Sequence, residues 1–194
     1  MRLVVTALAL AAAVAINTAS VALEQRRSLL SRRFGRRGWY VHLAVVTLPW
    51  ALFVALLPSI SGRVMWPLNP RLRPLGKALA VLGAAIWLDA FARMGPERTA
   101  NGYFFGHGPR QQVTGGVYRW LHNPMYDAYA LVLAGVGLRT RNARFLVLAA
   151  EAYLLLNLVE ARVENRPFSP APLSEPASED GESRKATPIA KKRR

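Results

Sequence analysis

The segment 122–127 reads His-Asn-Pro-Met-Tyr-Asp and brings three chemically useful side chains together. Histidine takes up and releases protons near neutral pH, so His122 is suited to the role of a base. The Tyr126 hydroxyl can donate or accept a hydrogen bond, and the Asp127 carboxylate can accept one. These three residue types are ones that could carry chemistry.

The same segment also fits the ordinary start of a helix. Proline is favoured at the first helical position, where a missing N–H does no harm, and Pro124 opens an apolar run. Asn123, directly before it, can cap the helix with its side chain. The pattern alone therefore favours a helix start over a reactive site.

Several other kinds of site are excluded by the sequence. His42, His107 and His122 do not have metal-ligand spacing, and the chain contains no HExxH motif. It has no cysteine, so it has neither disulfides nor thiolate chemistry. Phosphate-binding, dinucleotide-binding and GxSxG patterns are also absent from the sequence. We therefore expect no metal site.

Acidic residues inside apolar runs need a reason, because an unpaired charge in hydrocarbon is costly. Asp89 and Asp127 lie near the ends of such runs, where an interface or an arginine partner would accommodate them as well as a function would. Glu151 lies nearer the middle of a run, which favours a buried role. Glu160 begins a charged stretch, which fits an exposed helix end as well as a functional site.

Five long apolar runs must position these groups, at residues 2–23, 39–60, 75–94, 124–138 and 143–159. Runs of about 20 residues are long enough to cross ~30 Å of hydrocarbon as a helix. The fourth run is short for a span, so the last two runs could form a tight hairpin that does not fully cross. We predict an all-α fold, a polytopic transmembrane bundle of four to five helices.

The chain divides by composition into a transmembrane domain at 1–168 and a charged tail at 169–194. The tail is rich in Pro, Ser, Glu and Lys, and we expect it to be disordered. The first apolar run has features of a signal peptide, but no convincing small-residue cleavage site precedes Glu24, so a retained helix is the better interpretation. Nothing in the sequence sets an oligomeric state.

The formal net charge is +15, which in a soluble protein would suggest a nucleic-acid partner. Here the arginines lie between apolar runs, and six of them fall within residues 26–37. This placement instead predicts a cytoplasmic loop that contacts anionic lipid headgroups, with no nucleic acid bound. In a five-helix topology the N-terminus is then outside, and the segment 95–123 and the tail are inside.

The segment 95–123 holds six glycines and five aromatic residues. A loop of this length is uncommon unless it is functional. We expect it to cover a site at the cytoplasmic end of the bundle, with the glycines providing turns and the aromatic rings contacting a ligand.

Several segments recur in an order that is typical of one family. They are a small-residue helix through Gly83, Phe-Ala-Arg-Met-Gly at 91–95, Tyr-Phe-Phe-Gly at 103–106, Asn-Pro-Met-Tyr at 123–126 and Leu-Val-Glu at 158–160. On these segments, residues 75–168 resemble the membrane phospholipid methyltransferases of the phosphatidylethanolamine N-methyltransferase type. They are similar, more distantly, to the isoprenylcysteine carboxyl methyltransferases.

The resemblance implies S-adenosylmethionine as methyl donor, held by a Gly-x-Gly and by a Glu-Glu pair. The first falls on Gly83 and Ala85, where alanine replaces the second glycine, and the second on Glu160 and Ala161. The missing carboxylate removes a charge-assisted partner that contributes on the order of 1.5–3 kcal/mol. Glu164, one helical turn on, is a possible substitute. Further candidate donor contacts from the recurring segments are Gly106, Asn123 and Pro124.

The reaction that the resemblance implies is methylation of a membrane lipid, most simply the amine of phosphatidylethanolamine or its partly methylated forms. His122 would accept the amine proton, and Tyr126 or Asp127 would orient the amine. Alternatives are methylation of an isoprenylcysteine carboxylate or a small thiol, and a non-catalytic membrane protein on the same scaffold. The expected location is a bacterial inner membrane or the endoplasmic reticulum, with the site facing the cytoplasm.

Overall fold

The computed structural model describes residues 1–61, 67–107 and 113–164, and the regular structure of these residues is helical. The long helices are α1 (Arg2–Arg27), α3 (Gly38–Ile60), α4 (Arg73–Thr99) and α5 (Pro124–Thr140). A final helix begins as α6 (Ala143–Tyr153), continues through a π-helical stretch, η5 (Leu154–Glu160), and ends in α7 (Ala161–Glu164). The predicted all-α fold is confirmed, whereas the tail at 169–194 lies outside the described residues.

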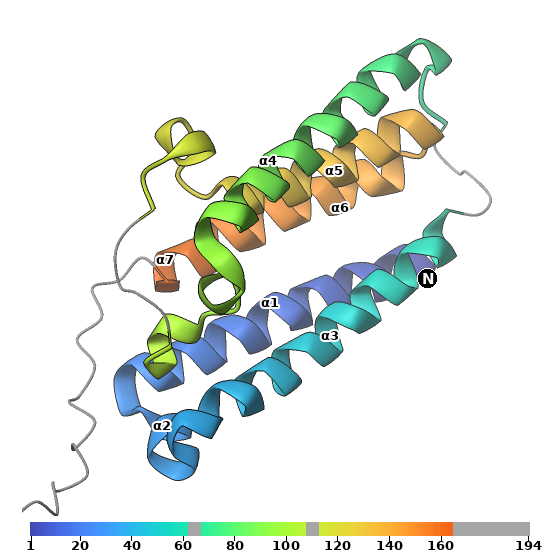
Figure 1. Cartoon of the computed structure of the whole chain (residues 1–194). Helices are drawn as coiled ribbons and strands as arrows, with labels where there is room; N and C mark the ends of the chain where they lie inside the picture. The colour runs from blue at the N-terminus through green and yellow to red at the C-terminus, as the bar shows by residue number, and fades with distance from the viewer. Residues whose placement is uncertain (62–66, 108–112, 165–194) are drawn as a thin grey trace, which may run out of the picture.

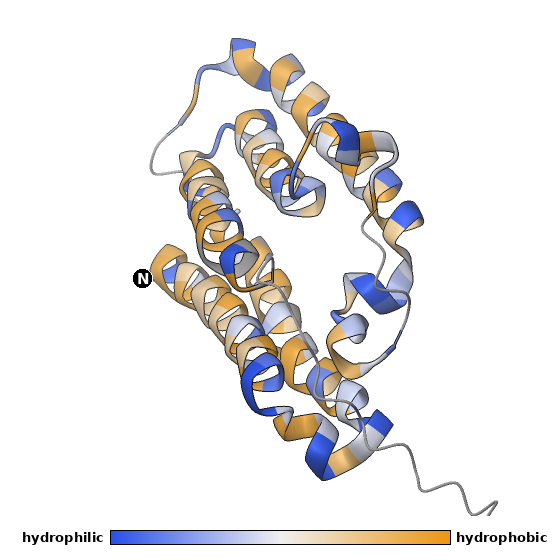
Figure 2. Cartoon of the chain, turned by 90° about the vertical axis from the view of Figure 1, so that its left-hand side faces the viewer, coloured by the Kyte–Doolittle hydropathy of each residue, from blue (hydrophilic) through white to orange (hydrophobic). Residues whose placement is uncertain are grey.

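The length and composition of the helices identify an integral membrane protein. The segments Arg2–Arg27, Leu29–Ile60 and Pro70–Phe105 are each long and apolar enough to cross a bilayer. Hydrophobic residues dominate these helices along their length (Figure 2). The shorter α5 has 17 residues, which gives a length of about 25 Å at 1.5 Å per residue.

The helices form two groups that face each other (Figure 1). One group is the antiparallel pair α1 and α3, and the other is α4, α5 and α6 packed side by side. Glycines allow α4 and α5 to approach closely. A Cβ atom on Gly135 would lie 2.7 Å from the Gly76 carbonyl oxygen, and one on Gly83 would lie 2.9 Å from Val132 Cγ2. Small residues at such contacts are the usual way for membrane helices to pack without a hydrophobic driving force.

An apolar core joins the two groups toward the end where α3 finishes. Leu10 and Val14 of α1 pack with Leu148 of α6 and Leu156 of η5, and all four side chains are buried. Phe53 of α3 belongs to the same cluster. The first helix is therefore part of the bundle in this structure, and its retention stays a prediction.

A buried asparagine ties three helix ends together at this end of the bundle. Asn142, between α5 and α6, donates its amide hydrogen to the Ile60 carbonyl at 2.9 Å. Its side-chain oxygen accepts from the Arg144 N–H at 3.1 Å and so caps α6. The α5–α6 turn therefore reaches the same end of the bundle as the end of α3.

Polar contacts gather the arginine-rich segment and the glycine-rich segment at the opposite end. Trp39 donates its indole N–H to the Ala100 carbonyl at 2.9 Å, and Gln25 donates to the Val163 carbonyl at 3.1 Å. This grouping agrees with the alternation of a five-helix topology. The side of the membrane that this end faces stays a prediction.

The long part of α4 ends at Gly95, as the sequence predicts. Gly95 has φ 77° and ψ 164°. This backbone conformation is not helical, and glycine adopts it readily because it has no Cβ atom. Pro96 follows and begins one further helical turn. The break directs the chain across the end of the bundle into the short 3₁₀ turn η3 (Gly102–Phe105).

Candidate functional site

A cavity of about 840 Å³ lies between the two helix groups, at the end that carries the glycine-rich segment. Its walls come from α1, from α3, from the end of α4 and from residues 113–126 with the first turns of α5. The volume falls within the roughly 300–1,000 Å³ range of small-molecule sites. The cavity is therefore large enough for a cofactor or for the polar part of a lipid.

The predicted motif at 122–126 lies in the wall of this cavity. His122, Asn123, Pro124 and Tyr126 all line it, and the His122 side chain is exposed at the site. Pro124 is the first residue of α5, as expected of a helix start. Asn123, however, makes no side-chain capping hydrogen bond with the helix. The helix-start interpretation accounts for the proline but leaves the asparagine side chain for another partner.

That partner is Asn157 in the π-helical stretch η5. The Asn123 amide donates to the Asn157 side-chain oxygen at 3.5 Å, and the Asn157 amide donates to Asp127 Oδ1 at 3.2 Å. Asp127 is thus held behind the motif, and it is not among the described residues that line the cavity. π-Helical turns are often found at functional sites. Here one turn supplies the side chain that bridges Asn123 and Asp127.

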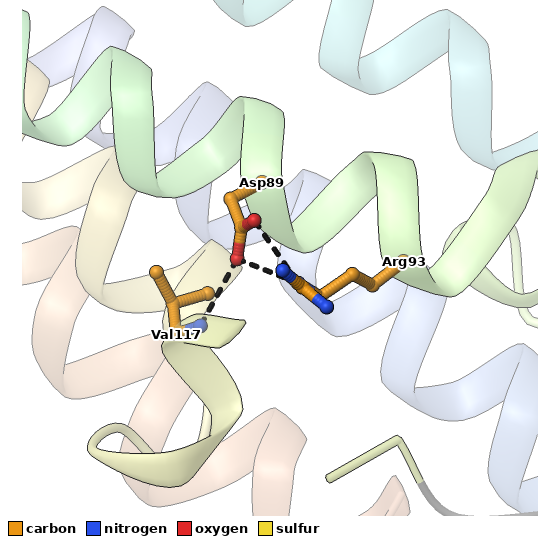
Figure 3. Close-up of polar contacts among 3 residues, drawn as sticks. All are labelled: Asp89, Arg93 and Val117. Atoms are coloured by element: carbon orange, nitrogen blue, oxygen red, sulfur yellow. Dashed lines mark hydrogen bonds and ion pairs between the residues drawn. The ribbon is translucent and has the colours of Figure 1, made fainter. Parts of the chain in front are cut away.

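A second anchor holds the chain segment opposite the motif. Asp89 Oδ2 of α4 accepts a hydrogen bond from the Val117 N–H at 3.0 Å (Figure 3). The same oxygen forms an ion pair with Arg93 Nε at 3.0 Å. Val117 belongs to the 3₁₀ turn η4 (Gly116–Arg119). The Asp89 carboxylate, which the sequence left between a structural and a functional role, therefore fixes the loop to the helix.

Gly116 is required by this contact. It has φ +60°, and a Cβ atom there would collide with both Arg93 and Asp89. The left-handed backbone and the close approach each favour glycine. The turn that results places the next residues, Tyr118 and Arg119, in the cavity wall.

Tyr118 brings a buried hydrogen-bonding group to the site. Its hydroxyl oxygen has no hydrogen bond within the described part of the chain. Burial raises the pKa of this hydroxyl above its ordinary value, against the weaker opposite effect of the nearby Arg98 guanidinium. The group therefore stays protonated and can donate to a ligand oxygen. Arg98 and Arg119 line the same cavity and bring positive charge to it.

The α1–α3 side of the cavity is polar and buried. His42 is 1% exposed, and its Nδ1 is hydrogen-bonded to Ser20 Oγ at 2.8 Å. Asn101 donates its amide hydrogen to the Asn17 side-chain oxygen at 3.2 Å. His42, Asn17 and Asn101 all line the cavity, so α1 and α3 contribute to the site as well as to the bundle.

Three of the predicted donor contacts lie away from the cavity in the described structure. Gly83 is buried in the contact between α4 and α5, Ala85 is exposed on α4, and Gly106 is an exposed turn residue with φ +78°. Glu160 ends η5 and Glu164 lies in α7, but their side chains lie outside the described residues. These five assignments stay predictions, and the cavity adds no contact in support of the first three.

Sequence reasoning missed part of the site. Trp50 and Tyr129 line the cavity and stack on each other, with ring centroids 5.8 Å apart and an interplanar angle of 24°. Inside apolar runs such residues look like ordinary membrane-helix side chains, so the sequence carries no signal for them. Arg98 does carry a signal, because it is a charged residue near the start of the glycine-rich segment 95–123. Among the described residues no cluster of three His, Cys, Asp or Glu side chains has the arrangement of a metal site.

Comparison with known families places these elements in context. A model of the family described as phospholipid methyltransferase matches residues 72–169, about half of the chain. The match covers α4, the Asp89–Val117 contact, the motif at 123–126 and the final helix with Asn157. Helices α1 and α3 precede it. No curated protein and no solved structure matches the chain.

Proposed function

The chain belongs to the phospholipid methyltransferase family, and we propose that it transfers methyl groups from S-adenosylmethionine to the amine headgroup of a membrane lipid. The proposed acceptor is phosphatidylethanolamine or its partly methylated forms. Family and fold make the protein a membrane methyltransferase, and the identity of donor and acceptor is the proposal. The observation that carries it is the Asn-Pro-Met-Tyr motif in the wall of a polar, aromatic cavity at one end of an apolar bundle.

The cavity residues suit the proposed donor. Its carboxylate would pair with Arg98 or Arg119, because charge-assisted hydrogen bonds to guanidinium are strong and geometrically specific. The buried Tyr118 hydroxyl would find in a ligand oxygen the partner that it lacks. Aromatic faces such as that of Tyr126 attract cations, which suits a positively charged sulfur. When bound, the donor supplies an activated methyl group.

The protein's own part in the reaction is to position the amine and to remove its proton. An ammonium group has no free electron pair, so the acceptor nitrogen must be neutral when its new bond to carbon forms. His122 lines the cavity and is exposed there, and we assign to it the acceptance of this proton. Tyr126 would hold the amine by a hydrogen bond. Asp127 would act indirectly, by fixing the start of α5 through Asn157.

The arrangement also suggests how the protein lies in its membrane. The arginine-rich segment and the cavity share one end of the bundle, so a cytoplasmic position of the arginines brings the site to the cytoplasm. A water-soluble donor would enter from there, and anionic headgroups would contact the arginines. We propose the bacterial inner membrane or the endoplasmic reticulum as the location.

The direct test uses purified protein in vesicles that contain phosphatidylethanolamine, with S-adenosylmethionine labelled in its methyl group. Label in mono-, di- or trimethylated headgroups is the expected result. Label that enters a prenylated cysteine peptide or a small thiol, but not lipid, would assign a different acceptor. A protein that neither binds the donor nor transfers label to any of these acceptors would be a non-catalytic member of the family.

A further inference from the structure

A second cavity, of about 610 Å³, lies deeper between α3 and α5. Most of its wall consists of hydrocarbon side chains and one phenyl ring, which come from α1, α3, α5 and the final helix. Examples are Leu10, Phe53, Val132, Leu133, Ala152 and Leu156. This hydrocarbon part of the wall offers no hydrogen-bonding partner to a polar ligand, and it suits an apolar one.

The second cavity adjoins the first. Thr47, Trp50 and Tyr129 line both of them. The stacked rings of Trp50 and Tyr129 therefore stand where the polar, aromatic cavity meets the apolar one. A molecule with a polar end and an apolar end would find the two environments in the order it requires.

The second cavity also reaches the outer surface of the bundle. Ala51, Val54 and Ala55 of α3 line it and are exposed, Val54 to 58%. They lie within Leu29–Ile60, a segment that is long and apolar enough to cross a bilayer. An acyl chain could enter sideways from the bilayer here without leaving an apolar environment.

We infer that the second cavity receives one hydrocarbon chain of the methyl acceptor while the headgroup lies in the first cavity, with Trp50 and Tyr129 at the junction. The inference rests on the proposed function, since it takes the acceptor to be a lipid. It adds that recognition extends beyond the headgroup to a single chain between α3 and α5. Continuity with the reaction cavity favours this occupant over a helix of another protein or a second copy of the chain.

The physical effect of the chain site is positioning. A hydrocarbon chain gains little by moving from the bilayer into the cavity, because lipid is as apolar as the cavity wall. Holding the chain nevertheless restricts where the headgroup can lie, and restricted placement of a reacting group raises the rate of its reaction. A lipid with long chains should therefore react faster than the same headgroup without them.

Two substitutions test this by filling the cavity. Ala51→Phe and Ala55→Phe each place a ring into it from an exposed position, so neither change disturbs a buried contact. Ala44→Phe is the matched control, because Ala44 is also exposed on α3 but lines neither cavity. Methyl transfer is measured with full-length protein on long-chain phosphatidylethanolamine and on a water-soluble short-chain analogue.

We expect the filling variants to lose about tenfold or more in rate on the long-chain lipid and to stay within about twofold of wild type on the short-chain analogue. The control variant should match wild type on both. Equal loss on the two acceptors, or no loss on either, would overturn the chain site.

A binding measurement separates this inference from the proposed activity. Phosphatidylethanolamine that carries a photoreactive group in one acyl chain should label the wild-type segments around Val132 and Leu133, and Ala51→Phe should abolish that labelling. This readout does not depend on methyl transfer. Absence of label from these segments in wild type would overturn the inference even if the enzyme is active. Label without any methyl transfer would leave the chain site standing and remove the proposed function.

Discussion

The Val117 backbone N–H donates a hydrogen bond to Asp89 Oδ2 at 3.0 Å, across 28 residues of sequence. The same carboxylate holds Arg93 one helical turn further along α4. This contact joins the helix before the glycine-rich segment to the turn after it. The position of Tyr118 and Arg119 in the cavity therefore depends on a carboxylate that itself lies outside the cavity wall.

Replacement of Asp89 by alanine should weaken donor binding. Without the carboxylate the η4 turn loses its tie to α4, so Tyr118 and Arg119 are no longer held in place. We expect the KM for S-adenosylmethionine to rise severalfold, with a smaller effect on kcat. Asp89→Asn keeps one oxygen to accept from Val117 and should fall between alanine and wild type. Identical donor KM values for all three proteins would contradict the anchoring role.

Gly116→Ala should be more harmful than the same change at Gly35. Both glycines have a positive φ, 60° and 57°. A non-glycine residue held in such a sparsely populated backbone region costs on the order of 1–3 kcal/mol. A Cβ atom on Gly35 meets nothing within 4 Å, whereas one on Gly116 collides with Arg93 and Asp89. Gly35→Ala thus measures backbone strain alone.

We expect Gly116→Ala to lower both the thermal stability of the purified protein and its affinity for the donor. Gly35→Ala should lower stability by the backbone strain alone, and so by less than Gly116→Ala, and should leave donor binding unchanged. If the two variants behaved alike, the contact between η4 and α4 would have no role in the site.

The bundle and the motif at 123–126 could be predicted from the sequence because their signals are local. Apolar runs report spanning helices directly, and Pro124 marks the start of α5 from its own chemistry. The role of Asp89 could not be predicted, because its partner is a backbone N–H 28 residues away. Only the folded chain shows which of the possible partners an aspartate meets.

Gly83 illustrates a different limit. A glycine in an apolar helix permits close approach of a ligand or of another helix, and both needs leave the same mark in the sequence. The structure shows the second, with Val132 and Ala128 of α5 where a Cβ atom would lie. Trp50 and Tyr129 were missed for the converse reason. Their stacking depends on which sides of α3 and α5 face each other in the folded chain, and no local sequence pattern gives this.

Tyr118→Phe should separate stability from ligand binding. The buried hydroxyl lacks a hydrogen bond within the described residues, and a buried unsatisfied group costs about 1–3 kcal/mol. Its removal should leave the ligand-free protein as stable as wild type or more stable. Donor affinity should fall by about 10- to 150-fold, since one hydrogen bond to a charged ligand contributes about 1.5–3 kcal/mol. Loss of stability together with unchanged donor affinity would contradict this assignment.

The same variant gives a prediction for high pH. Burial raises the pKa of Tyr118 in the folded protein, so loss of the hydroxyl proton favours the unfolded chain. The stability of the protein therefore falls as the pH rises from the pKa of the unfolded chain through the higher folded value. Wild type should therefore lose stability more steeply than Tyr118→Phe above about pH 10, the ordinary pKa of tyrosine. Thermal unfolding of both proteins across this range measures the difference. Parallel curves would show that the hydroxyl is not buried.

His122→Ala should reduce methyl transfer most strongly at neutral pH. A general base contributes about 10²–10⁴-fold, and near neutral pH an amine acceptor is mostly protonated. As the pH rises, the acceptor loses its proton to solvent and the need for a base disappears. The variant should therefore recover toward wild-type turnover at alkaline pH.

His107→Ala is the control, because His107 contacts the Arg36 carbonyl at 3.1 Å and is not among the described residues that line the cavity. A His122→Ala profile parallel to that of wild type at every pH would remove His122 from the proton transfer, and the buried His42, which lines the same cavity, would be the next base to test.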